Sequence, residues 1–198
     1  EILRGLVGSE MCIRDSDILD YYVEIEHFDK MVARALNSLD KAGQTDNTIV
    51  VVTSDHGMPF PRAKASLHDQ GTRVPLAIRW PKGIREPGRV FSGLVNLSDL
   101  APTFLEAAGL AVPKMMNANS LHDIIEKQPN TTRLTAFIAM ERHDGCRKGG
   151  KGYPSRAIRT KDYMYILNHM PDRWPAGNPD REFCARDLPF GEVDSSPT

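Results

Sequence analysis

The stretch that decides the fold is Thr48-Ile49-Val50-Val51-Val52, which runs directly into Thr53-Ser54-Asp55-His56-Gly57. A β-branched run bounded by polar residues predicts a buried strand. In open α/β sheets, ligands bind beyond the carboxyl ends of the strands. The carboxylate of Asp55 and the imidazole of His56 follow such an end. We therefore expect them to form about half of a metal site.

An amphipathic helix is predicted before this strand. Between residues 18 and 39, apolar residues recur at steps of three and four, and Gly43 supplies a stop signal. A short polar connector, residues 44–47, leads into the strand. The order predicts an αβ unit of the doubly wound type, with the helix packed on the sheet.

The first sixteen residues differ from the rest. They show no clear hydrophobic period and no helix cap, and they resemble the translated read-through of a sequencing adapter. We expect residues 1–16 to be a non-native segment and leave them out of the fold prediction. A natural loop or strand is the alternative.

Several short elements are predicted downstream of the first strand. Turn residues bound two further strands, residues 74–80 and 90–95. A helix follows, with Ser98 or Asp99 as its cap, Pro102 in its first turn and Gly109 just past its end. Beyond residue 113, the pattern favours a helix at 121–127, a strand at 134–140, a hairpin of 156–160 with 163–168, and an irregular tail from 171.

Composition restricts the function only broadly. The 198 residues carry 25 basic and 26 acidic side chains, a near-neutral balance that gives no sign of a nucleic-acid or membrane partner. The three cysteines, Cys12, Cys146 and Cys184, lie far apart, so neither a disulfide framework nor a zinc site is indicated.

Four linked motifs carry a resemblance to a known family. In chain order they read DNTIVVVTSDHG, PFPRAK, GTRVPLAIRWP and NLSDLAPTFLEAAGL. From about residue 17 to 110, the chain resembles the C-terminal part of the sulfatase family, which belongs to the alkaline-phosphatase-like superfamily. Later segments are similar to the subgroup that includes N-sulfoglucosamine sulfohydrolase, namely ERHDGC, YPSRAIRTKDYMYI and PDRWPAGNP.

The resemblance implies an α/β fold. We expect part of an alkaline-phosphatase-like mixed sheet flanked by helices over residues 17–112. A smaller C-terminal antiparallel α+β subdomain with an extended tail is expected over 113–198. The implied reaction is hydrolysis of a sulfate ester or sulfamate on a sulfated sugar or glycosaminoglycan. The implied location is periplasmic or extracellular.

The resemblance also implies roles for residues near the first strand. Asp55 would bind a divalent metal, by family analogy Ca²⁺, which prefers oxygen ligands. His56 would bind the same metal or donate a hydrogen bond to the sulfate. Lys64 stands where the family places a cation on the sulfate, and Arg62 is a second candidate because its planar fork can hold two sulfate oxygens.

Other polar residues have two interpretations. His68 and Asp69 would bind the sugar or orient Lys64, or they form a turn. His143 and Asp144 follow a predicted strand and suit recognition of an acidic glycan, or they belong to a charged surface cluster. We interpret Asp99 and Arg73 as structural, with Arg73 paired to a buried carboxylate.

The chain lacks one signature that the resemblance leads us to expect. Sulfatases carry a formylglycine made in a C/S-x-P-S/A-R motif, and this sequence contains no such motif. Without a nucleophile and with only part of the metal site, the isolated chain is expected to be inactive. The alternatives are a fragment of another alkaline-phosphatase-like phosphoester hydrolase and a non-catalytic metal-binding remnant.

Overall fold

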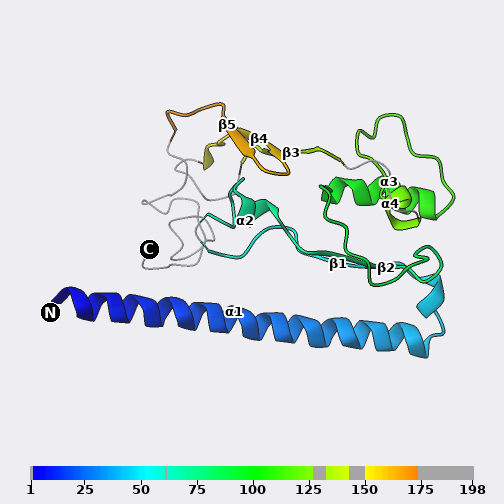
Figure 1. Cartoon of the computed structure of the whole chain (residues 1–198), viewed down its shortest axis with the longest axis horizontal. Helices are drawn as coiled ribbons and strands as arrows, with labels where there is room; N and C mark the ends of the chain where they lie inside the picture. The colour runs from blue at the N-terminus through cyan, green and yellow to red at the C-terminus, as the bar shows by residue number, and fades with distance from the viewer. Residues whose placement is uncertain (1, 61, 127–132, 143–149, 174–198) are drawn as a thin grey trace.

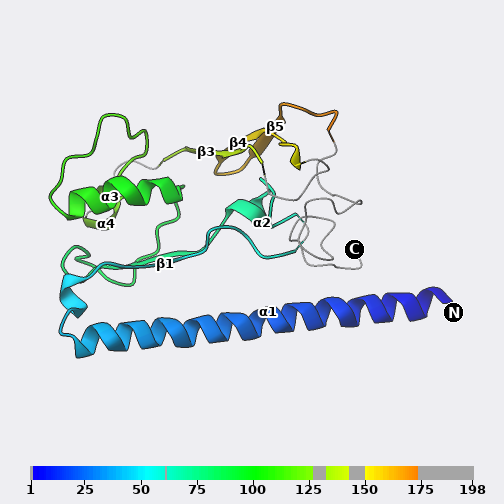
Figure 2. The ribbon, with the colours of Figure 1, turned by 180° about the vertical axis from the view of Figure 1, so that it is seen from behind.

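The computed structural model describes residues 2–60, 62–126, 133–142 and 150–173, with side chains from residue 18 onward. A long helix, α1, runs along one side of the molecule (Figure 1). The strands β1 and β2 form the next layer, and the helices α3 and α4 lie beyond them with the sheet of β3, β4 and β5 (Figures 1 and 2). The structure confirms a mixed α/β fold with antiparallel sheets.

Helix α1 spans Ile2–Lys41, so the backbone of residues 2–16 is helical rather than irregular. Leu, Arg, Met and Glu in this segment favour a helix, and extending an existing helix adds one hydrogen bond for each residue ordered. The predicted stop is confirmed, because Gly43 has φ 63°. The Gly43 N–H donates to Asp40 O at 2.9 Å and the Gln44 N–H to Leu39 O at 2.9 Å, which is the Schellman arrangement.

The prediction that this helix packs on the sheet is wrong. On its apolar face, Tyr22, Ile25 and Phe28 are 56%, 46% and 53% exposed, and Val32, Leu36 and Leu39 are only half-buried. Tyr21 makes an edge-on ring contact with Phe60, at a centroid distance of 5.9 Å. The amphipathic period indicates which face of a helix is apolar, but it does not say what covers that face.

The first two predicted strands are confirmed, although their pairing differs from the doubly wound expectation. Strand β1, Val50–Thr53, pairs antiparallel with β2, Leu76–Arg79, in the register Thr53 to Leu76. A short 3-10 helix, η1, Thr45–Asn47, precedes β1. A parallel neighbour needs a long crossover, usually a helix, whereas the segment after β1 folds as a loop with a single helical turn, α2, Asp69–Thr72.

The segment after β2 departs from the prediction. Residues 90–95 are not a strand but an extended connection that leads to η2, Leu97–Asp99, and α3, Leu100–Ala107. The predicted helix is thus confirmed, and Gly109 just beyond it has φ 73°. The predicted side-chain cap is wrong, because Asp99 at the cap position makes no capping hydrogen bond to α3. A second short helix, α4, His122–Glu126, matches the next predicted element. Residues 90–95 are apolar and partly β-branched, but such a segment forms a strand only where a partner strand accepts its hydrogen bonds.

The C-terminal part contains the expected antiparallel sheet, while its division into a subdomain over 113–198 stays a prediction. Its strands are β3, Thr135–Met140, β4, Ser155–Thr160, and β5, Met164–Asn168, in the order β3-β4-β5. The predicted hairpin is confirmed, and its turn is closed by the Thr160 N–H donating to Tyr163 O at 2.8 Å. The tail predicted from residue 171 lies outside the described residues from 174 onward.

Few of the described residues are fully buried, and the apolar core comes from the loop after β1, from α4 and its first flank, and from β3 and β4 with the segment before β4. The buried apolar members are Ala63, Leu67, Leu121, Ile125, Ala136, Tyr153 and Ala157. Asp99 is also buried, with 1% of its surface exposed, and Arg133 donates to its Oδ2 at 2.5 Å. This ion pair links the start of α3 to the segment that enters β3.

Candidate functional site

The end of β1 presents Asp55 and His56 side by side. The Thr53 hydroxyl donates to Pro75 O at 2.7 Å and ties this strand end to the segment before β2. The Ser54 hydroxyl donates to His56 O at 2.7 Å and holds the chain in a bend. The Asp55 side chain is 85% exposed and the His56 side chain 42%, with Oδ2 and Nε2 3.7 Å apart.

The hydrogen bond of the His56 ring decides which nitrogen is available. Its Nδ1 lies 2.8 Å from Gly57 O. A carbonyl oxygen only accepts, so Nδ1 carries the hydrogen. In the neutral ring, Nε2 then keeps a lone pair on the side near Asp55. A histidine that binds a metal ordinarily has this arrangement, in which its other N–H donates to a carbonyl or carboxylate.

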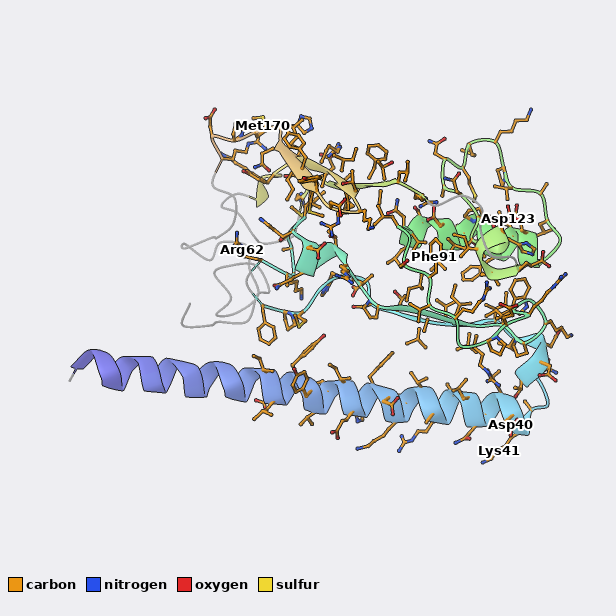
Figure 3. The ribbon with its side chains drawn as sticks, in the orientation of Figure 1. Asp40, Lys41, Arg62, Phe91, Asp123 and Met170 are labelled. Carbon is orange, nitrogen blue, oxygen red and sulfur yellow. The ribbon has the colours of Figure 1, made fainter. Side chains whose placement is uncertain are left out.

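The loop after β1 carries Arg62 and Lys64. Two of its non-glycine residues, Arg62 and Ala65, have positive φ values of 63° and 57°. Such values cost free energy, so the surrounding contacts must hold this backbone in place. The Lys64 N–H donates to Met58 O at 2.9 Å, and Ala63 between the two cations is 1% exposed. Arg62 is exposed at the outer edge of this loop (Figure 3).

His68 is held within the same loop by Ser66. The Ser66 hydroxyl lies 2.9 Å from His68 Nδ1 and also accepts the His68 N–H at 3.0 Å. His68 precedes α2, so the turn interpretation of this residue fits its backbone contacts. The expected orientation of Lys64 by His68 stays a prediction.

Two glycines allow α2 to lie against both ends of the loop. The Gly57 N–H donates to Gly71 O at 3.2 Å. A Cβ on Gly57 would stand 1.9 Å from Gln70 O, and one on Gly71 would stand 2.2 Å from Ala63 O. Real side chains do not approach backbone oxygens this closely, so both positions require glycine.

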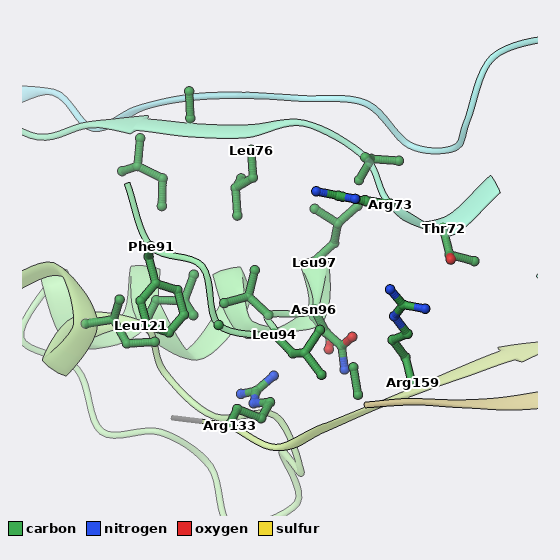
Figure 4. A pocket seen from close by; sticks show the side chains of 18 of the residues that line it. Thr72, Arg73, Leu76, Phe91, Leu94, Asn96, Leu97, Leu121, Arg133 and Arg159 are labelled. Carbon is green, nitrogen blue, oxygen red and sulfur yellow. The ribbon is translucent and has the colours of Figure 1, made fainter. Parts of the chain in front are cut away.

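A cleft of about 2340 Å³ adjoins this loop. Its lining includes Asp55, His56 and Asp69, together with Arg133 and Arg159 from the C-terminal part of the chain. Figure 4 shows Arg159 and Arg133 on the side of the cleft opposite Leu76. Arg62, Lys64 and His68 do not line it. The structure thus brings Asp55, His56 and Asp69 to the cleft and leaves Arg62, Lys64 and His68 beside it.

Two predicted recognition residues lie outside the described chain, and the structural role predicted for Arg73 is wrong. His143 and Asp144 lie outside the described residues. Arg73 does not pair with a buried carboxylate. Its Nη1 lies 4.0 Å from Asp69 Oδ2, and the two side chains are 81% and 44% exposed. Arg73 extends beside α2 from a surface turn, where its charge remains solvated.

Sequence reasoning missed Arg133 and Arg159. Arg133 pairs with Asp99, and Arg159 Nη2 lies 3.3 Å from Asp69 Oδ1. Arg159 stands in the quoted segment YPSRAIRTKDYMYI and Arg133 in none of the quoted motifs, but neither position indicated which carboxylate the arginine pairs with.

The side chains described in the structure contain no group of three His, Cys, Asp or Glu that is arranged to hold a metal ion. Asp55 and His56 supply two donor atoms, Oδ2 and Nε2, which lie 3.7 Å apart. Over the same described residues, none of the helices is both long and apolar enough to span a membrane.

Comparison with known proteins gives a family match. The family model described as Sulfatase matches residues 8–110. An ulvan-active sulfatase of Formosa agariphila is 33% identical over 148 residues, which cover 75% of this chain and 28% of that protein. Human N-sulphoglucosamine sulphohydrolase is 27% identical over 77% of this chain and 31% of its own length. The predicted resemblance is confirmed, and the chain spans about 30% of the length of these relatives.

One solved structure agrees with this match. It is described as a complex with its substrate, D-glucosamine-2-N,6-O-disulfate. The two chains are 29% identical with a TM-score of 0.54, over 73% of this chain and 32% of the other. The likeness in fold therefore extends beyond the short motifs to most of the chain.

Proposed function

The chain belongs to the sulfatase family, and on this premise we propose that it forms part of an enzyme that hydrolyses sulfate esters or sulfamates of sulfated sugars. The observation that carries the proposal is the pair at the end of β1. Asp55 Oδ2 and His56 Nε2 lie 3.7 Å apart at the cleft, and the second ring nitrogen is already engaged by Gly57 O.

Asp55 and His56 fit a divalent cation as two of its ligands. The carboxylate is a hard oxygen donor. The 3.7 Å between Asp55 Oδ2 and His56 Nε2 is short enough for both atoms to bind one ion at 2.0–2.6 Å. We propose Ca²⁺ by family analogy. When bound, the cation offsets negative charge on the sulfuryl oxygens. The remaining ligands come from residues outside this pair, since calcium takes six to eight oxygens.

Lys64 is proposed as the cation that contacts the sulfate. Its backbone is held by the hydrogen bond to Met58 O, and the neighbouring Ala63 is buried, so its Cα has a defined position. The four-carbon stem of lysine lets the ammonium reach beyond the loop as a point charge. Arg62 is proposed as a second anion contact, and His68, His143 and Asp144 as contacts of the sugar.

The nucleophile of this proposal is a formylglycine that this chain does not encode, because its sequence contains no C/S-x-P-S/A-R motif. The isolated chain is therefore expected to release no sulfate. Sulfated sugars are the proposed substrates, because the compared relatives are an ulvan-active sulfatase and an N-sulphoglucosamine sulphohydrolase. A periplasmic or extracellular location is proposed with this substrate class.

The test begins with long-read sequencing of the source DNA across the codons for Ser16 and Asp17. A frame that continues upstream into a formylglycine motif is the expected result. The longer protein is then assayed for sulfate release from glucosamine 6-sulfate and N-sulfoglucosamine. Lys64→Met should lower kcat/KM by roughly 10²- to 10³-fold, the usual effect of removing a group that stabilises transition-state charge.

Lys41→Met serves as the matched control for Lys64→Met. Lys41 is an exposed lysine at the end of α1, on the opposite side of the view from Arg62 in Figure 3, and its replacement should leave kcat/KM unchanged. Equal activity of Lys64→Met and the parent enzyme would contradict the role of Lys64. Hydrolysis of phosphate esters without release of sulfate would support a phosphoester hydrolase instead.

A further inference from the structure

An ion pair connects the C-terminal sheet to the loop that carries Lys64. Arg159 lies on β4, and its Nη2 is 3.3 Å from Oδ1 of Asp69, the first residue of α2. The two side chains are 26% and 44% exposed. Figure 4 shows Arg159 extending from the second sheet toward the α2 segment that ends at Thr72.

Helix α2 supports both ends of the loop. Gly71 O accepts the Gly57 N–H, and Gly57 directly follows His56. The backbone of Gly71 also lies so close to Ala63 O and Ser66 O that a Cβ would stand 2.2 and 2.4 Å from them. A displacement of α2 would therefore move the backbone on either side of Lys64 and beside His56.

A helix of one turn does not hold its own position. The nucleation cost of a helix is repaid only by further turns or by tertiary contacts, and α2 has four residues. Arg73 lies 4.0 Å from the other oxygen of Asp69, but it is 81% exposed and belongs to the same segment. Arg159, by contrast, comes from a strand that is paired on both sides, with β3 and with β5.

We propose that Arg159 is a positioning residue, which holds α2 through Asp69 and thereby fixes the loop that presents Lys64 and His56. This inference rests on the proposed function in one respect, namely that the loop presents Lys64 to the sulfate and His56 to the metal. The contact itself is a property of the described residues. Arg159 touches neither the metal ligands nor the sulfate in this proposal, so it is not a catalytic residue.

The test measures native-state amide exchange by NMR in the 198-residue chain. Arg159→Met should speed exchange of the Gly57 and Gly71 amides by roughly three- to fivefold, because a partly exposed ion pair contributes at most about 1 kcal/mol. The control is Arg156→Met on the same strand. Arg156 pairs with Glu141 instead, so its replacement should leave both amides unchanged.

A charge swap separates the ion pair from other effects of the substitution. The double variant Arg159→Asp with Asp69→Arg should restore slow exchange, since the two charges are exchanged but still face each other. Unchanged exchange in Arg159→Met would overturn the inference. Equal acceleration by Arg156→Met would overturn it as well, because the effect would then be a general loss of stability.

Binding of inorganic sulfate supplies a readout that a purely structural role does not move. Sulfate should shift the Lys64 amide resonance of the parent chain, and Arg159→Met should weaken this binding by at least threefold while the charge swap restores it. A parent chain whose Lys64 amide ignores sulfate would contradict the proposed role of Lys64. Sulfate binding that Arg159→Met leaves unchanged would contradict the positioning role, even if exchange is faster.

Discussion

Arg133 Nη1 donates to Oδ2 of the buried Asp99 at 2.5 Å, which joins the segment before β3 to the turn that begins α3. The same carboxylate accepts the Asn96 N–H at 2.8 Å and the Asn119 N–H at 3.2 Å. A buried carboxylate is tolerated only when such donors surround it. Asp99 therefore connects three separate parts of the chain at one point.

Asp99→Asn should destabilise the fold by about 3–5 kcal/mol, because it leaves the Arg133 guanidinium without its counter-charge in a largely buried position. Urea unfolding followed by circular dichroism measures this loss. Glu141→Gln is the control, since Glu141 and Arg156 form an exposed pair. That change should cost less than about 1 kcal/mol. Similar losses of unfolding free energy for the two variants would contradict the explanation that burial makes the Asp99–Arg133 pair the more important of the two.

Asp55→Asn should weaken Ca²⁺ binding at least roughly tenfold, because the substitution removes the charge of one ligand. His56→Ala should weaken it as well if Nε2 binds the ion. Isothermal titration calorimetry of the 198-residue chain measures both affinities. Asp46→Asn is the matched control, as Asp46 lies in η1 before the strand rather than at its carboxyl end. Equal affinity for Asp55→Asn and the parent chain would exclude Asp55 as a ligand.

Gly71→Ala should open the loop, because the new Cβ would meet Ala63 O and Ser66 O at 2.2 and 2.4 Å. We expect a loss of about 1–3 kcal/mol in unfolding free energy, as for other overpacked sites, together with faster exchange of the Gly57 amide. Gly43→Ala offers a comparison without crowding, since a Cβ added at Gly43 would have no atom within 4 Å. It should leave the Gly57 amide unaffected, and a change there would argue against a local effect.

Leu121→Ala should cost about 2–5 kcal/mol, because Leu121 is only 3% exposed and its truncation leaves a cavity. Phe28→Ser on α1 should change stability by less than about 0.5 kcal/mol, since its ring is 53% exposed. Urea unfolding compares the two. A large loss for Phe28→Ser would mean that the apolar face of α1 is covered in solution.

The local elements were predictable because their signals are local. Periodicity located β2, β4 and β5, and Gly43 and Gly109 marked helix ends through a backbone conformation that glycine adopts readily. The same reasoning failed for residues 90–95, because they have an apolar, β-branched character but no strand among the described residues accepts their hydrogen bonds.

Part of the candidate site was also predictable. Asp55 and His56 are neighbours in the sequence, so their proximity follows from one bend after β1. The hydrogen bond from His56 Nδ1 to Gly57 O was not predictable, because it depends on the ring orientation that this bend produces. The roles assigned to Lys64, Arg62 and His68 stay predictions.

By itself, the sequence determined the family through four motifs in order. It also determined the main short elements and the adjacency of Asp55 to His56, because these depend on residues within a few positions of one another. Only the tertiary structure decided that β1 and β2 run antiparallel, that much of the apolar face of α1 stays exposed, and which arginine pairs with which carboxylate. The pairs Asp99 with Arg133 and Asp69 with Arg159 join distant segments. Ionic contacts of this kind have no sequence period, so the path of the whole chain selects the partners.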